Sequence, residues 1–165
     1  MRAETEGLII RSFSETAIPA YAAIVADPRV TKYLADGSPN SPTEAEAYVL
    51  DCIDGDHATG ISRYAVLLQC DESLTGFFGF KELPACIDFG WRFVQHVWDQ
   101  GYATEAALRI LAYGLEDLNL TNLAAGSFTE NVASIKIIRK LGFRHVQGDQ
   151  FHGKATVRYY QQTII

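Results

Sequence analysis

The strongest pattern of hydrophobic and polar positions runs through residues 102–118. Apolar residues recur there at steps of three and four, which places them on one side of an α-helix. They are Ala103, Ala106, Ala107, Ile110, Leu111, Gly114, Leu115 and Leu118. The pattern predicts a long amphipathic helix.

A second well-marked helix is predicted for residues 131–141. Asn131 is a favourable N-cap, and Gly142 suits the position just past a helix end. Basic residues toward the C-terminal half would complement the helix dipole. They are Lys136, Arg139 and Lys140.

The first part of the chain predicts two more helices and a helical turn. Residues 14–28 form one helix, which Ser14 can cap and Pro28 ends. Residues 28–34 suggest a helical turn, and the turn-forming residues 36–42 suggest a loop. Residues 41–60 form the next amphipathic helix. Its apolar positions are Ala45, Tyr48, Val49, Cys52 and Ile53.

Runs of strand-forming residues alternate with these helices. The predicted strands are 8–13, 63–69, 74–83, 86–94, 120–128, 143–148 and 155–164. The three middle strands are joined by "CDES" and "PA", lengths that suit antiparallel hairpins, and the last two form a hairpin pair. The order is strand, two helices, three strands, helix, strand, helix and two strands. It indicates a mixed α/β (α+β) fold.

Composition narrows the class of protein. The chain has 165 residues without repeats or linkers, which predicts a single domain over residues 1–165. Neither a secretory signal nor a membrane-length apolar run is recognisable. A net charge of -6 argues against nucleic-acid binding. Three separated cysteines are typical of reduced, cytoplasmic thiols, and the four histidines lack zinc-site spacing, so we expect no metal.

The stretch "VWDQGYATEA" (residues 97–106) places Gly101 where the long helix begins. The first N–H groups of a helix have no partner within it and lie at the positive end of the dipole, so they can bind a phosphate. Gly101 would let the backbone approach such a ligand closely. A turn glycine that only serves helix–sheet packing is an equally good interpretation. The segment contains neither a Rossmann nor a Walker A motif.

The wider sequence resembles the GNAT acyltransferase superfamily. The resemblance rests on "IDFGWRFVQHVWDQGYATEAALRILAYGLEDLNL" and the later "NVASIKIIRKLGF". Within the superfamily the chain is similar to the branch that acetylates ribosomal-protein N-termini. The matching features are the Gly90-to-Gly101 spacing, Trp98, the segment "GYATEA", Asn131, Ser134 and the segment "KLGF". "VTKYLADGSPNSPTEAEAYV" also looks like that branch.

The resemblance implies a mostly antiparallel sheet whose two middle strands splay apart to admit acetyl-coenzyme A as co-substrate. It implies that backbone amides bind the pyrophosphate, at Gln100, Gly101, Tyr102, Ala103 and Thr104. Main chain of Trp91, Phe93 and Val94 would pair with the pantetheine amides like an added strand. Asn131 would hydrogen-bond the pantetheine arm, although plain N-capping also explains this residue.

Two positions depart from the branch pattern. Asp99 replaces a usual glycine, and because a carboxylate facing pyrophosphate would repel it, we expect Asp99 to point away. Asp88 stands where the branch usually has glutamate.

The implied chemistry is direct attack of an amine on the thioester. Asp88 and Glu82 are candidate bases, with a salt bridge or ordinary strand polarity as the structural interpretation. Ser134 is the candidate acid, with local bonding to helix amides as the alternative. A backbone N–H of the strand ending at Val94 would stabilise the oxyanion. His96 has a suitable intrinsic pKa, but a lone loop histidine is more often exposed.

The sequence therefore predicts an N-acetyltransferase that acts on a primary amine, either a protein N-terminus or a small molecule. A transferase for a longer acyl chain and an acyl-coenzyme A sensor with little catalysis are the alternatives. Arg92 could meet an acidic acceptor, although a solvated or paired arginine is the simpler interpretation. We expect no nucleic-acid or membrane partner, and a monomer or homodimer.

Overall fold

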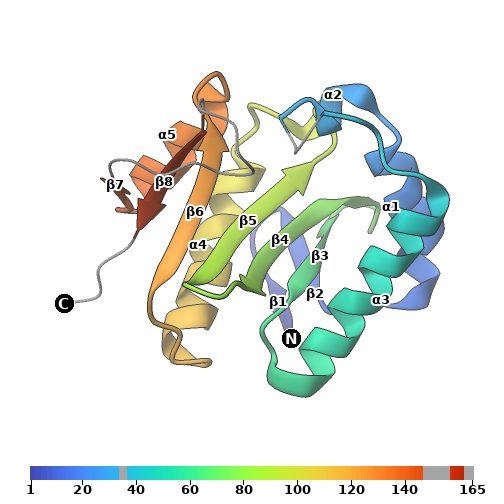
Figure 1. The fold of residues 1–165 in the computed structure, drawn as a ribbon. Coiled ribbons are helices and arrows are strands. Elements are labelled where there is room, and N and C mark those ends of the chain that lie inside the picture. Colours follow the sequence, from blue (N-terminus) through green and yellow to red (C-terminus); the bar gives the residue numbers. More distant parts are fainter. Residues whose placement is uncertain (34–36, 147–156, 162–165) are drawn as a thin grey trace.

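A computed structural model describes residues 1–33, 37–146 and 157–161. Within these residues the core is one eight-stranded sheet in the order β1-β2-β3-β4-β5-β6-β8-β7 (Figure 1). The strands are β1 (Arg2–Glu4), β2 (Leu8–Arg11), β3 (Arg63–Leu68), β4 (Leu74–Glu82), β5 (Ile87–Phe93), β6 (Leu123–Phe128), β7 (Arg144–Val146) and β8 (Val157–Gln161).

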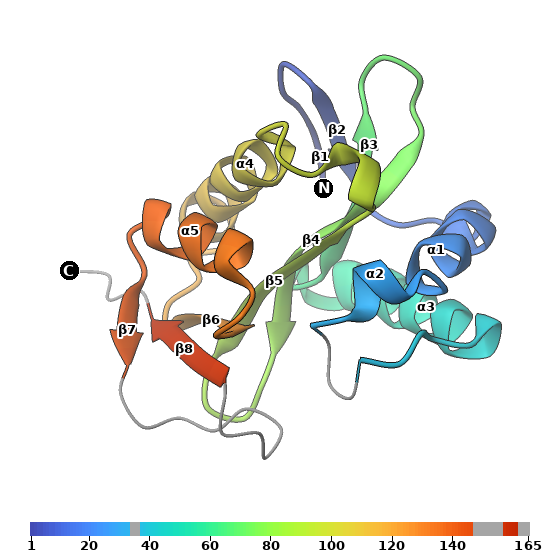
Figure 2. The same cartoon turned by 90° about the horizontal axis from the view of Figure 1, so that it is seen from above.

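Helices cover both faces of the sheet. They are η1 (Glu15–Ala17), α1 (Ile18–Val25), α2 (Pro28–Thr31), α3 (Pro42–Thr59), η2 (Gln95–Val97), α4 (Tyr102–Glu116) and α5 (Val132–Lys140). Seen from above, α4 and α5 lie on one side of the central strands, and α1, α2 and α3 lie on the other (Figure 2). The mixed α/β architecture predicted from the sequence is confirmed.

The middle of the sheet opens between β5 and β6. These two strands run parallel and pair only at Ile87 with Leu123 and at Asp88 with Ala124. Beyond that point they diverge toward their C-terminal ends (Figure 1). The other neighbouring pairs recorded for the described strands are antiparallel. The splayed, mostly antiparallel sheet expected from the resemblance is therefore present.

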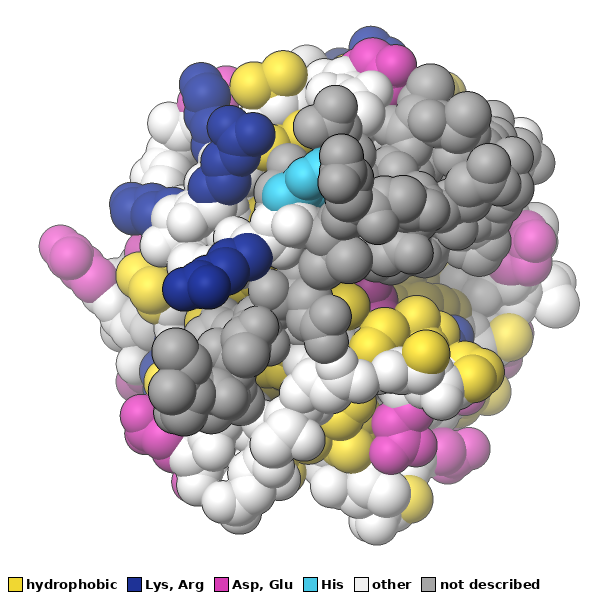
Figure 3. Space-filling model, turned by 60° about the vertical axis from the view of Figure 1, so that its left-hand side comes forward, with side chains coloured by type: hydrophobic (Ala, Val, Ile, Leu, Met, Phe, Trp, Pro, Cys, Tyr) yellow, Lys and Arg dark blue, Asp and Glu magenta, His cyan; other side chains and the backbone are white. Residues whose placement is uncertain are grey.

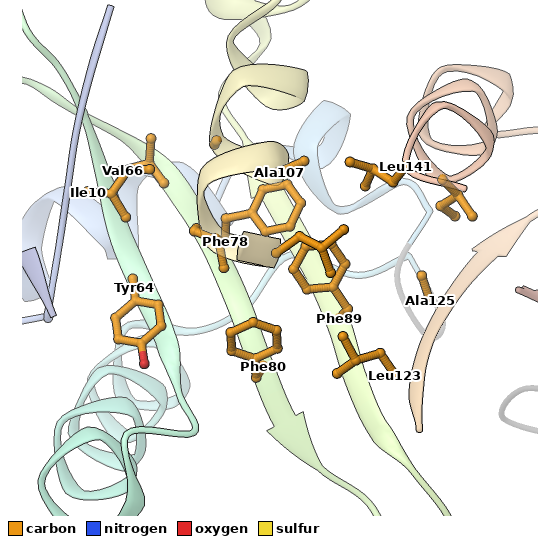
Figure 4. Packing of buried hydrophobic residues seen from close by; sticks show 14 of the residues in the cluster. Ile10, Tyr64, Val66, Phe78, Phe80, Phe89, Ala107, Leu123, Ala125 and Leu141 are labelled. Carbon is orange, nitrogen blue, oxygen red and sulfur yellow. The ribbon is translucent and has the colours of Figure 1, made fainter. Parts of the chain in front are cut away.

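Each face of the sheet has its own hydrophobic core because side chains of a strand point alternately to opposite faces. Phe78, Phe80 and Phe89 face α4 and α5, and they pack beneath Ala107 (Figure 4). Phe77 and Ala65 face α1 and α3 instead. Full burial of such an aromatic side chain contributes about 1.5–3 kcal/mol.

Capping fixes the ends of α3 by local chemistry. Ser41 Oγ accepts a hydrogen bond from the Glu44 N–H at 3.3 Å, and Glu44 Oε2 accepts one from the Ser41 N–H at 2.7 Å. This reciprocal capping box satisfies two N–H groups at the helix start. Gly60 ends the helix at φ +75°, a left-handed conformation that glycine adopts without steric cost.

Three details differ from the sequence-based expectations. The predicted helix 14–28 is divided into η1 and α1, and Ser14 makes no side-chain cap, bonding Thr16 Oγ1 at 2.8 Å instead. The helical turn predicted at residues 28–34 is present as α2. Strand β1 was not predicted, because three residues are too short to show a hydrophobic period. Residues 34–36, 147–156 and 162–165 lie outside the described residues, and so do parts of the predicted helical turn 28–34, of the predicted loop 36–42 and of the final strand pair.

Candidate functional site

The edge of β5 that faces the opening is left without a neighbouring strand. The Val94 N–H donates to Thr75 O of the other neighbour, β4, at 2.8 Å. Because an antiparallel ladder alternates, Trp91 and Phe93 turn their N–H and C=O groups the opposite way, toward the opening. Past Asp88 the described register gives them no partner on β6. An extended ligand can pair with this edge, but not through the Val94 N–H.

The loop after β5 is folded back onto the strand end. Trp98 Nε1 donates to Phe93 O at 2.9 Å, and Gln100 Nε2 donates to His96 O at 2.6 Å. These two bonds hold the short helix η2 and the following residues in one conformation. They therefore position the start of α4 beside the opening.

Gly101 is the N-cap of α4 and has φ +90°. The N–H groups of Gly101, Tyr102 and Ala103 have no hydrogen-bond partner among the described residues. A Cβ added at Gly101 would meet nothing within 4 Å. The three amides therefore lie at the positive end of a helix dipole without a partner among the described residues, and the space beside Gly101 is open. The N–H of Thr104 is already used, donating to Gly101 O at 3.0 Å, so only its hydroxyl is available.

Asp99 has a left-handed backbone conformation, with φ +59°. This explains why the resembling branch has glycine at the position, since glycine adopts positive φ most readily. Aspartate tolerates it better than most residues. The residue is exposed. It places a negative charge in the chain two residues before the free amide of Gly101.

A contact that the sequence did not suggest secures the first turn of α4. Glu105 Oε1 accepts a hydrogen bond from the Gly7 N–H at 2.8 Å. A Cβ added at Gly7 would lie 2.6 Å from Cε1 of the Tyr102 ring. The β1–β2 turn thus packs against the residue that follows Gly101. Only the glycine at position 7 hinted at this close approach.

The start of α5 lies at the same edge of the sheet, because α4 follows β5 and α5 follows β6 (Figure 2). Asn131 Oδ1 accepts a hydrogen bond from the Ser134 N–H at 3.2 Å, so the N-cap interpretation of Asn131 is confirmed. The Ser134 hydroxyl makes no hydrogen bond to any described residue, and the side chain is half-buried. That hydroxyl is free to act on a ligand.

The two candidate bases are not brought together. The register pairs Lys81 with Asp88 and Glu82 with Ile87, so Glu82 and Asp88 point to opposite faces of the sheet. Glu82 is exposed at the end of β4. Asp88 Oδ2 forms an ion pair with Arg63 Nη2, which is the salt bridge that the structural interpretation anticipated.

Arg63 was not singled out by its sequence, where it merely begins an apolar strand. Its side chain is 9% exposed and lies across Gly79 and Gly90. Arg63 Nη1 donates to Gly90 O at 3.0 Å and also to Gly79 O. A Cβ at Gly90 would lie 3.0 Å from that nitrogen, so the glycine leaves room for the arginine.

Arg92 and His96 lie on the other side of the strand end. The Arg92 guanidinium lies 5.4 Å from the centre of the Phe77 ring. His96 is exposed, as its structural interpretation predicted. It borders a groove of about 660 Å³ whose walls include Ile24 of α1, Val30 of α2 and Val94.

The surroundings of the site differ in the burial of their cysteines and in their surface charge. Burial raises the pKa of the Cys52 thiol to about 11, so this residue stays protonated, whereas Cys70 is exposed. Basic side chains gather on the side of the molecule seen in Figure 3, although the whole chain is acidic. Helix α5 contributes exposed Lys136, Arg139 and Lys140. These cations can attract an anionic ligand.

The described residues offer neither a metal site nor a membrane-spanning helix. Within residues 1–33, 37–146 and 157–161, no group of three or more His, Cys, Asp or Glu side chains could hold a metal ion. None of the described helices combines the length and hydrophobicity needed to cross a membrane.

Comparison with known proteins adds independent information. The family described as "Acetyltransferase (GNAT) domain" matches residues 7–144. The uncharacterized N-acetyltransferase YnaD of Bacillus subtilis strain 168 is 31% identical over 146 residues, which are 87% of this chain and 83% of YnaD.

Solved structures share the fold. A GNAT-family acetyltransferase from Bacillus anthracis is 25% identical and has a TM-score of 0.82, over 99% of this chain and 98% of that one. RimL, a ribosomal L7/L12 alpha-N-protein acetyltransferase in complex with coenzyme A, is 16% identical with a TM-score of 0.83, again over 99% and 98%. At that identity the likeness to RimL concerns the fold alone.

Proposed function

The chain belongs to the GNAT acetyltransferase family and is an N-acetyltransferase, and we propose that it transfers an acetyl group from acetyl-coenzyme A to a primary amine. The observation that carries the proposal is the set of free amides at the start of α4, next to the unpaired edge of β5. Both lie at the end of the sheet where β5 and β6 diverge.

The residues present fit acetyl-coenzyme A. The N–H groups of Gly101, Tyr102 and Ala103 would hold the pyrophosphate, because they are unpaired and lie at a helix N-terminus. The main-chain groups of Trp91 and Phe93 would pair with the pantetheine amides. Asn131 would donate its side-chain N–H₂ to the same arm, since its Oδ1 is already used as a cap.

The reaction follows from these positions. The amine nitrogen attacks the thioester carbon, the carbonyl oxygen becomes an oxyanion, and the carbon–sulfur bond breaks as the amide forms. Whichever of the Trp91 and Phe93 N–H groups is not paired with the pantetheine arm would stabilise the oxyanion, since both point into the opening. Ser134 would donate a hydrogen bond to the departing thiolate and relay a proton to it, giving its hydroxyl proton to sulfur while taking one from water, so that both leave the step neutral. A carboxylate, Asp88 or Glu82, would take the proton lost by the amine, directly or through water.

The resemblance to one branch of the superfamily bears on the class of acceptor, for which there are two candidates. The motif around Gly101 and the later "KLGF" segment are those of the branch that acetylates ribosomal-protein N-termini, so a protein N-terminus is one candidate. A small-molecule amine is the other. Transfer of a longer acyl chain, and binding of acyl-coenzyme A with little catalysis, are outcomes that the same experiments separate.

Calorimetric titration of acetyl-coenzyme A into the purified protein is the first test. We expect micromolar affinity that weakens sharply for pantetheine, which lacks the pyrophosphate. Amine-dependent release of free thiol then separates an enzyme from a sensor. Undetectable binding of acetyl-coenzyme A would overturn the proposal.

Ser134→Ala tests the proposed acid. We expect a lower kcat with little change in acetyl-coenzyme A affinity, because only the hydroxyl is removed and the helix cap is made by Asn131. Ser73→Ala, in the β3–β4 turn, is a matched control. An unchanged kcat in the Ser134 variant would contradict the assignment.

A further inference from the structure

Several buried donors on the α1–α3 face of the sheet have no hydrogen-bond partner among the described residues. They are the Tyr21 hydroxyl, Arg63 Nε, and Nε and Nη1 of Arg92. These residues come from α1, β3 and β5, and the charges of both arginines act on the Tyr21 hydroxyl. Buried donors without partners cost free energy, so such a cluster needs an explanation.

The two arginines differ in how their charge is balanced. Arg63 pairs with Asp88, so its charge is neutralised. Arg92 makes no ion pair or hydrogen bond within residues 1–33, 37–146 and 157–161, and its charge lies against the Phe77 ring. Among the described residues, one positive charge on this face is therefore left without an anion. A half-buried cation of this kind is costly unless a ligand completes it.

Neighbouring groups on the facing helices do not supply the missing anion. Burial raises the pKa of Tyr21 above its ordinary range, against the opposing effect of Arg92, and raises the pKa of Tyr48 as well. Burial also raises the pKa of Cys52 to about 11. All three are neutral at physiological pH, so the charge of Arg92 persists.

The position of Arg92 relates it to the reaction. It lies between Trp91 and Phe93, whose main-chain groups face the opening between β5 and β6. Its own side chain points to the opposite side, over Phe77 and toward α1 and α3. Val94, two residues later on the same face, lines the 660 Å³ groove beside α1 and α2. Nε and Nη1 of Arg92 are buried, whereas the residue as a whole is half-buried, so a ligand would reach the guanidinium from its remaining exposed part.

We propose that Arg92, assisted by the Tyr21 hydroxyl, binds a carboxylate of the acceptor, so that the acceptor is an amine that also carries a carboxylate. A guanidinium matches a carboxylate in shape and charge through two parallel hydrogen bonds. The inference rests on the proposed function for the amine, but the anion site itself can be tested separately. Free amino acids and peptides with an acidic side chain near the N-terminus are the two sources of this chemistry.

Stability of the ligand-free protein gives the first test. Arg92→Met removes a poorly satisfied charge and keeps a side chain of similar length. We expect the thermal midpoint to rise, or at least to hold, while Arg11→Met on the exposed end of β2 serves as a matched control. A fall of several degrees in the Arg92 variant alone would mean that the residue is structural, and would overturn the inference.

Binding gives the second test. Acetate, succinate and glycine should each raise the thermal midpoint of the wild-type protein at millimolar concentration, and methylamine or glycinamide should not. Arg92→Met should lose this response, and Arg11→Met should keep it. Equal responses of the wild type and Arg92→Met, or no response of the wild type, would overturn the inference. Stabilisation by phosphate but not by carboxylates would overturn the choice of a carboxylate.

Turnover links the site to the acceptor. Two acceptor pairs are compared: glycine with glycinamide, and C-terminally amidated peptides beginning Ser-Asp with amidated peptides beginning Ser-Asn. In each pair that reacts, we expect the KM of the member with the carboxylate to be at least tenfold lower. Arg92→Met should abolish that preference without changing acetyl-coenzyme A affinity. If the wild type binds no acetyl-coenzyme A, the proposed function fails, while the carboxylate-binding result stands on its own.

Discussion

Gly101 illustrates how a single residue can serve both backbone geometry and ligand binding. Its φ of +90° is strained for any residue with a Cβ, and nothing of the described protein lies within 4 Å of where that Cβ would be. Packing therefore does not require the glycine, which weakens the interpretation as a turn residue that serves helix–sheet contact. The remaining reasons are the left-handed conformation and the space for a ligand.

Gly101→Val should weaken acetyl-coenzyme A binding at least tenfold, about 1.4 kcal/mol, because a branched side chain would occupy the space in front of the amides. Gly142→Val is a closely matched control, since Gly142 has φ +82° and an equally open position after α5. Both variants should lose similar stability, on the order of 1–2 kcal/mol. Equal coenzyme affinity of the two variants by calorimetry would show that the pyrophosphate binds elsewhere.

Asp99→Gly should have the opposite effect. Removing a side chain at φ +59° relieves backbone strain, and removing the carboxylate lessens repulsion of the pyrophosphate. We expect a stability gain of up to about 1 kcal/mol and tighter binding of acetyl-coenzyme A. Glu72→Gly, at φ +55° in the β3–β4 turn, should gain stability alone. Because we expect the carboxylate to point away, the gain in affinity should be small, and unchanged affinity in the Asp99 variant would show that its charge does not reach the pyrophosphate.

At the scale of the element, strand β5 does three things because its residues alternate. Trp91 and Phe93 present main-chain groups to the opening, whereas Arg92 and Val94 place side chains on the α1–α3 face. The main-chain groups of Arg92 and Val94 pair with β4, as the hydrogen bond from the Val94 N–H to Thr75 O shows. A single-residue shift in register would exchange these roles, so the hairpin with β4 fixes the candidate site.

The first turn of α5 allows capping to be separated from coenzyme binding. Asn131→Asp keeps the Oδ1 acceptor for the Ser134 N–H and removes the side-chain donor proposed for the pantetheine arm. We expect full stability with reduced acetyl-coenzyme A affinity, measured by urea unfolding and calorimetry. Asn131→Ala should lose both, including about 0.5–2 kcal/mol of stability. If the Asp variant binds as tightly as the wild type, Asn131 acts only as a cap.

For the whole molecule, the sheet divides two sets of groups. The free amides and Ser134 lie toward α4 and α5. Half-buried Arg92 and Tyr48 and buried Tyr21 and Cys52 lie toward α1 and α3. The opening between β5 and β6 connects the two sides at one edge. This arrangement suits a transferase in which donor and acceptor approach from different directions.

The neutral groups under α1 and α3 make the free energy of unfolding depend on pH in the alkaline range. Burial raises the pKa of Cys52 to about 11, so between the ordinary thiol pKa of about 8.5 and pH 11 the folded state binds more protons than the unfolded state. The free energy of unfolding must therefore fall as pH rises through this window, and the buried tyrosines extend the fall above pH 10. Urea unfolding at pH 7, 9 and 10.5 measures it, and Cys52→Val should lessen the fall. A midpoint independent of pH would contradict the prediction.

The sequence by itself determined what depends on neighbouring residues. Helices α4 and α5, the N-cap Asn131 and the glycine at the start of α4 could be predicted because apolar periodicity, capping and dipole effects act within a few residues. The two family motifs were recognisable for the same reason. The sequence did not predict strand β1 or the division of residues 14–28, because such short elements carry little periodic signal.

Only the tertiary structure decided which distant residues meet. It placed Glu82 and Asp88 on opposite faces, joined Asp88 to Arg63 across Gly90, and tied Gly7 to Glu105. It also left Arg92 without an anion among the described residues. These outcomes depend on strand register and on the divergence of β5 from β6, and register is set by pairing between segments far apart in the chain rather than by any local pattern.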